Sequence, residues 1–79
     1  MKVHRVRATW DAEAKVWVAE SDDVPGLATG AATIEELLAK LRIMIPELLE
    51  LNADEGASAE VDVPIELLAS YSETVRRSA

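Results

Sequence analysis

Four carboxylates are the side chains of this 79-residue chain best suited to chemistry: Asp22, Asp23, Glu35 and Glu36. If the loop that carries the aspartates folds back over the segment that carries the glutamates, the four acids would crowd together. Crowded carboxylates can act as a general acid or bind a hard cation. Acids on an acidic domain more commonly form a solvated rim than a chemical site. We expect a rim formed by these four acids to face a binding partner.

Other residue types offer little for catalysis. His4 is the single histidine, and the chain has no cysteine. Zinc sites in proteins favour histidine and cysteine ligands, so we expect no metal. A nucleophile needs a positioned base such as histidine, and we expect no catalytic residue and no cofactor. A minimal hydrolase that uses Asp11, Asp22 or Asp23 with a divalent cation is the weakest alternative.

Charge and length restrict the partners. Acidic residues outnumber basic ones by 15 to 8, which gives a net charge of −7 and disfavours nucleic acid and anionic membranes. A basic protein is the expected partner. A chain this short has a small core, so we also expect a homodimer or a higher homo-oligomer. No apolar run suits a signal peptide or a membrane helix, and we expect a cytoplasmic location.

Alternating hydrophobicity predicts two strands, at residues 3–10 and 16–20, joined by a short polar connection. We expect them to pair antiparallel. Trp10 and Trp17 lie one on each strand. A role as stacking platforms for bases conflicts with the acidic composition, so we interpret both tryptophans as core or interface anchors.

The stretch SDDVPGLATG, residues 21–30, predicts a turn followed by a short strand at 27–31. Pro25 presets φ for one central position of a type II turn, and Gly26 tolerates the positive φ of the next. Thr33 then predicts the N-cap of a helix over 33–51, with Glu36 completing a capping box. Apolar residues recur at helical spacing on both sides of Pro46, which favours one kinked helix over two separate helices.

The final element has two interpretations. Apolar residues at odd positions predict a strand over 59–71, in which Pro64 implies an edge, a bulge or a break. A short helix over 65–76 is the alternative, and we favour the strand.

Together these elements predict an α+β fold of two layers. Three to four mostly antiparallel strands, in the order strand–strand–strand–helix–strand, would pack on one amphipathic helix. We expect one domain over residues 1–79.

Three motifs in this order resemble the HicB-like antitoxin family, which includes small standalone members of unassigned function. They are Trp10-Asp11 with the strand VWVA at 16–19, the segment DVPGL at 23–27, and TIEELL at 33–38. The resemblance covers about residues 3–50 and implies a partial ribonuclease-H-like fold without catalytic acids. It also implies structural roles for six motif residues: Trp10, Asp11, Trp17, Pro25, Gly26 and Thr33.

Antitoxins of that family bind and block HicA-like toxins, which are small basic RNA-cleaving proteins. The resemblance therefore implies a non-enzymatic interaction domain that neutralises such a toxin. Family members usually add a DNA-binding module after this domain, and we expect none here. The alternative is a self-associating or small-ligand-binding module that has no toxin partner.

Overall fold

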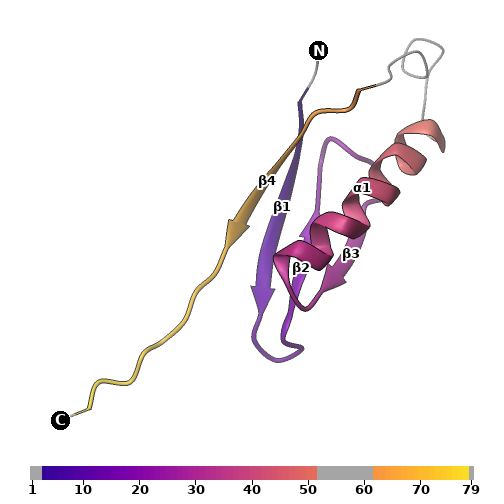
Figure 1. The fold of residues 1–79 in the computed structure, drawn as a ribbon. Helices are drawn as coiled ribbons and strands as arrows, with labels where there is room; N and C mark the ends of the chain where they lie inside the picture. The colour runs from indigo at the N-terminus through magenta and orange to yellow at the C-terminus, as the bar shows by residue number, and fades with distance from the viewer. Residues whose placement is uncertain (1–2, 52–61, 79) are drawn as a thin grey trace.

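A computed structural model describes residues 3–51 and 62–78 of the chain. The elements are β1 (His4–Asp11), β2 (Val16–Glu20), β3 (Ala28–Ala31), α1 (Ile34–Leu51) and β4 (Ile65–Ser70). Their order matches the predicted order, and α1 lies on one side of the sheet (Figure 1). The predicted α+β class is therefore confirmed.

β1 is an inner strand of a four-stranded sheet in the order β3-β2-β1-β4. It pairs antiparallel with β2, where Trp10 lies opposite Trp17, and parallel with β4, where Val6 lies opposite Leu67. β3 pairs antiparallel with β2. The predicted antiparallel pairing of the two tryptophan-bearing strands is confirmed, and the parallel pair makes the sheet mixed.

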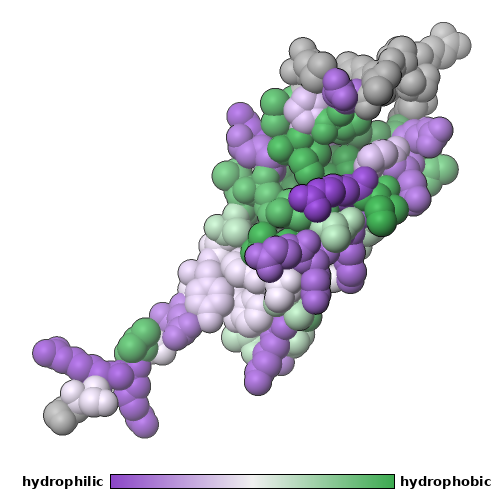
Figure 2. Space-filling model, in the orientation of Figure 1, coloured by the Kyte–Doolittle hydropathy of each residue, from purple (hydrophilic) through white to green (hydrophobic). Residues whose placement is uncertain are grey.

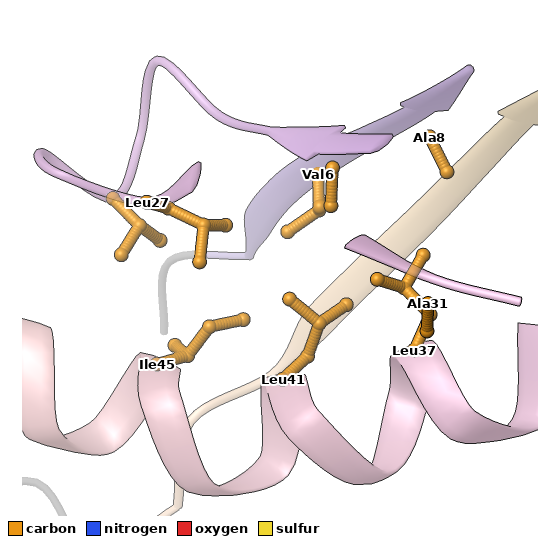
Figure 3. Close-up of a cluster of buried hydrophobic side chains, with 9 residues drawn as sticks. Val6, Ala8, Leu27, Ala31, Leu37, Leu41 and Ile45 are labelled. Atoms are coloured by element: carbon orange, nitrogen blue, oxygen red, sulfur yellow. The ribbon is translucent and has the colours of Figure 1, made fainter. Parts of the chain in front are cut away.

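The core lies between the sheet and α1. On β1, Val6 and Ala8 are buried while Arg5, Arg7 and Thr9 are exposed, as a period of two requires. Three helix residues at i, i+4 and i+8 point into the same core (Figure 3): Leu37, Leu41 and Ile45. His4 is buried on this face as well, and its Nδ1 has no hydrogen-bond partner among the described residues.

The start of α1 is fixed by Thr33. Its Oγ1 accepts a hydrogen bond from Glu36 N at 3.1 Å, and its carbonyl accepts one from Leu37 N at 3.0 Å. Thr33 is thus the predicted N-cap, and the helix proper begins at Ile34. It continues through Pro46 to Leu51, which confirms one helix rather than two. Within residues 3–51 and 62–78, no helix is long and apolar enough to cross a membrane.

The last strand is shorter than predicted. We expected residues 59–71; residues 59–61 lie outside the described part of the chain, and β4 runs from Ile65 to Ser70. Pro64 has no N–H for the ladder, and its carbonyl accepts a hydrogen bond from His4 N at 2.9 Å just before β4 begins. The alternative helix over 65–76 is wrong because residues 65–70 pair with β1.

Replacing Leu41 with alanine tests the core. Leu41 is fully buried, so Leu41→Ala should lower the free energy of unfolding by about 2–5 kcal/mol through lost burial and a cavity. Ile43, two residues along the same helix, is 64% exposed, and Ile43→Ala should change it by about 0.5 kcal/mol or less. Urea titration followed by circular dichroism measures both. Equal losses would contradict the assigned helix face.

Candidate functional site

Asp11 holds the β1–β2 hairpin together. Its Oδ1 accepts hydrogen bonds from Glu13 N at 3.0 Å and Ala14 N at 3.2 Å. Its carbonyl accepts one from Lys15 N at 2.7 Å, and Lys15 has a positive φ of 56°. Aspartate commonly caps a turn in this way. The bonds of Asp11 are those of a turn-forming residue.

Asp23 and Ser21 continue the β-ladder beyond the end of β2. β2 ends at Glu20, so the earlier part of β1 has no strand partner on that side. There Arg5 N donates to Asp23 Oδ2 at 2.8 Å, and Ser21 Oγ donates to the Arg5 carbonyl at 2.5 Å. The same Oγ accepts a hydrogen bond from Asp23 N at 3.0 Å. Asp23 therefore fastens its loop to the sheet.

Val24, Pro25, Gly26 and Leu27 form the predicted turn. Leu27 N donates to the Val24 carbonyl at 3.1 Å, and Gly26 has a φ of 86°, which is the region that a type II turn requires at this position. A Cβ on Gly26 would lie 3.6 Å from Leu48 Cδ2. The turn thus packs beside the C-terminal half of α1.

The structure separates the four predicted acids into two pairs. Asp22 and Asp23 belong to the loop that packs near Leu48, whereas Glu35 and Glu36 lie in the first turn of α1. Thirteen residues of helix span about 20 Å, so the pairs lie near opposite ends of α1. The crowded cluster considered from the sequence does not form. In the described part of the chain, no group of three or more acids and histidines is arranged to hold a metal ion.

The loop aspartate Asp22 also pairs with an arginine side chain. On the sheet face away from α1, Arg7 lies 3.3 Å from Asp22 and 3.6 Å from Glu20. Arg5 similarly lies 3.6 Å from Glu66. A depression of about 270 Å³ runs between these groups and is lined by Arg5, Arg7, Asp22, Asp23 and Leu68. Because its charges are paired, this face offers little net field to a charged partner.

Acids predominate on the solvent side of α1. Glu36, Ile43, Glu47 and Glu50 are exposed and lie seven, four and three residues apart, which places them along one face of the helix. We call these four residues the acidic stripe. Ile43 lies in its middle and is 64% exposed. Lys40 lies between Glu36 and Ile43 along the helix. Its Nζ is directed toward β3, where it donates a hydrogen bond to the Gly30 carbonyl at 2.5 Å.

Sequence reasoning missed three members of this stripe. It selected Glu36 for its cap position and did not consider Glu47, Glu50 or Ile43. One signal was available in the sequence. Ile43 does not fit the helical spacing of the apolar residues that face the core, so an isoleucine at that position had to point to solvent.

Trp10, Trp17 and Tyr71 form an aromatic cluster on the α1 side of the sheet. The ring centroids lie 5.4 Å apart for Trp10–Trp17, 5.6 Å for Trp10–Tyr71 and 5.9 Å for Trp17–Tyr71. The two tryptophans are half-buried, and Tyr71 is 52% exposed. The rings contact one another, so they leave no space for a ligand between them. Such a cluster presents an aromatic surface of the kind enriched in protein interfaces.

The Tyr71 hydroxyl donates a hydrogen bond to Glu73 Oε1 at 2.6 Å. This bond favours the neutral phenol and, with partial desolvation and the negative charge of Glu73, raises the pKa of Tyr71. The bond lies within residues 71–78, an exposed segment after β4 that we call the arm.

Two comparisons with known proteins give a match. A family model described as "Domain of unknown function (DUF1902)" matches residues 3–79. A crystal structure of a hypothetical protein from the extremely thermophilic bacterium Thermus thermophilus is 53% identical, covers 96% of this chain and 100% of its own, and has a TM-score of 0.69. Curated proteins give no significant match. The matched descriptions assign no activity or partner.

The two aspartates should differ in their effect on stability. Asp23→Ala removes a charged acceptor from the Arg5 amide and should lower the free energy of unfolding by about 1.5–3 kcal/mol. Asp22→Ala removes an exposed ion pair and should lower it by about 1 kcal/mol or less. Chemical denaturation of both variants provides the comparison. A larger loss for Asp22→Ala would contradict the assigned loop anchor.

Tyr71 is the single tyrosine, so its titration can be followed directly by phenolate absorbance. We expect it to ionise at higher pH than an ordinary tyrosine because Glu73 stabilises the protonated phenol. Glu73→Gln removes the negative charge and should lower the pKa of Tyr71. An unchanged titration curve in that variant would show that Glu73 does not contact the hydroxyl.

Proposed function

This chain belongs to the DUF1902 family, and from that premise we propose that it is a non-enzymatic interaction domain that binds a small basic protein. The acidic stripe on α1 is the proposed contact surface. A cytoplasmic place of action is part of the same proposal. The proposal rests on one observation above all, namely that the exposed Ile43 shares the free face of the helix with the exposed glutamates Glu36, Glu47 and Glu50.

The chemistry of the stripe suits a basic partner with an apolar contact residue. Ile43 supplies an apolar contact, and Glu47 and Glu50, four and seven residues along the helix, supply negative charge on its C-terminal side. Glu47 and Glu50 have no arginine or lysine in the last turn of the helix to neutralise them. The overall charge of −7 would attract a basic protein and accelerate association.

The resemblance to HicB-like antitoxins gives the partner a more specific form. We propose that the basic partner is a HicA-like toxin and that binding blocks its action on RNA. The motif residues Trp10, Asp11, Trp17, Pro25, Gly26 and Thr33 support the proposal through the fold only. Asp11 and Gly26 form turns between strands, and Thr33 caps α1. Asp22 pairs with the Arg7 side chain and Asp23 accepts a hydrogen bond from the Arg5 amide, so we assign the partner-facing role to the glutamates of α1 instead.

A pull-down with charge-reversed bait tests the proposal. The purified protein should retain a small basic protein from a lysate of its source at low salt and release it at moderate salt. Glu47→Lys should weaken retention by about tenfold, because it replaces an attraction with a repulsion in the stripe. Ile43→Ala should also weaken it.

Glu13→Lys is the matched control, since Glu13 is exposed in the β1–β2 hairpin and the change in net charge is the same. It should leave retention within about twofold of the native protein, because its charge lies outside the stripe. Equal losses of retention for Glu13→Lys and Glu47→Lys would mean that binding depends on the net charge of the bait and not on the acidic stripe. Bait that retains no basic protein would favour a module without a toxin.

A further inference from the structure

One helix is too narrow to cover the whole face of this four-stranded sheet. Four strands spaced about 4.8 Å apart span roughly 15–19 Å, whereas a helix with its side chains is about 10 Å wide. α1 lies over β2 and β3 (Figure 1). Ile65 and Leu67 of β4 face the same side and stay only half-buried at the margin of the core. Hydrophobic surface accordingly gathers in the middle of the visible face, where β4, β1 and α1 lie (Figure 2).

The two edges of the sheet differ. At the β3 edge, the Lys40 side chain bonds to the Gly30 carbonyl, and a lysine at this place discourages a further strand. At the other edge, β4 pairs with β1 alone among the described residues. Its sequence IELLAS carries one charge, on Glu66, and Leu68 is exposed on its far face. The β4 edge therefore remains open to pairing.

The arm continues from β4 away from the body of the molecule (Figure 1). It is exposed along residues 71–78, and Val75 is 79% exposed. The molecule measures 62 Å along its longest axis but only 21 and 18 Å along the others. An extended segment that carries apolar side chains into solvent gains little stability from its own domain.

Charge distinguishes the arm from the rest of the chain. Residues 71–78 contain one acid, Glu73, and two bases, Arg76 and Arg77, for a net charge of +1. Because the whole chain carries −7, the other residues carry −8. The arm is therefore complementary in charge to the body of another copy.

A specific acidic pair lies beside the place where the arm begins. Tyr71 contacts Trp17, and Trp17 pairs in the sheet with Ala31. Thr33 caps α1 two residues later, and Glu35 and Glu36 follow in the first helical turn. The aromatic cluster and this acidic pair thus occupy the same end of the molecule.

We propose that a second copy of this chain covers the β4 side, and that the two copies exchange arms. In a two-fold arrangement, each arm would cross the aromatic cluster of the other copy, and Arg76 and Arg77 would pair with its Glu35 and Glu36. Arg76 lies five residues beyond Tyr71, a reach of about 17 Å in extended chain. Tyr71 and Val75 supply apolar contact, and the open β4 edges lie next to the exchange. The inference does not depend on a basic partner protein. In the dimer the arm would take Glu36, and Ile43, Glu47 and Glu50 of the acidic stripe would stay open to that partner.

Reciprocal charge reversal tests the exchange in full-length protein. One variant carries Glu35→Lys and Glu36→Lys, and the other carries Arg76→Glu and Arg77→Glu. Each variant alone would set like charges against each other, so its dimer dissociation constant should rise by about tenfold or more relative to the native protein. An equimolar mixture should form a heterodimer of near-native affinity, because both arm contacts are complementary again. Analytical ultracentrifugation, with circular dichroism to verify folding, measures all three samples.

The control reverses two acids elsewhere on the same helix, Glu47→Lys with Glu50→Lys. Both lie near the opposite end of α1, and the change in net charge equals that of the first variant. This control should dimerise like the native protein while losing the basic partner of the proposed function, so the two proposals fail separately. The dissociation constant of the native dimer should also rise with salt.

Three results would overturn the inference. They are a native protein that is monomeric at every concentration, charge-reversed variants that dimerise as the native protein does, and a mixture that remains monomeric. In the last case the arginines would not contact the glutamates of another copy. If a variant loses its circular dichroism spectrum, the salt series on the native protein decides, and an association constant independent of salt would contradict the arm contact.

Discussion

The width of a single helix is the constraint on which the rest of this structure depends. Leu37, Leu41 and Ile45 bury the centre of the sheet, and that burial is the main favourable contribution to folding. The same helix cannot reach all four strands, so the β4 side is left at the margin of the core. A small domain with an incomplete layer commonly completes it by association. The fold thus creates the surfaces that we assign to other proteins.

Local interactions decide which surfaces these are. Asp11 closes the hairpin that places Trp10 opposite Trp17, and Asp23 fastens the following loop to β1. The turn at Gly26 then reverses the chain into β3, and Thr33 starts α1 directly beyond Ala31. Together these contacts bring the negatively charged first turn of α1 to the end of the sheet that carries the aromatic cluster. It also leaves the stripe around Ile43 on the opposite side of the helix from the core.

Features with local signals could be predicted from the sequence. The cap at Thr33, the turn at Gly26 and the alternation along β1 each depend on a few neighbouring residues, and all three occur as expected. The separation of Asp22 and Asp23 from Glu35 and Glu36 could not be predicted, because it depends on the loop packing near Leu48. The start of β4 was placed too early, since alternation continues through Pro64 while the hydrogen-bonded ladder cannot. The contact between Tyr71 and two distant tryptophans required the parallel pairing of β1 and β4.

Amide hydrogen exchange in β4, followed over a range of protein concentrations, tests most directly whether a second copy completes the incomplete layer. If it does, the amides of Leu67 and Leu68 and of the arm should exchange more slowly as concentration rises, while those of β2 stay constant. Exchange in β4 and the arm that is independent of concentration would contradict a second copy at this edge.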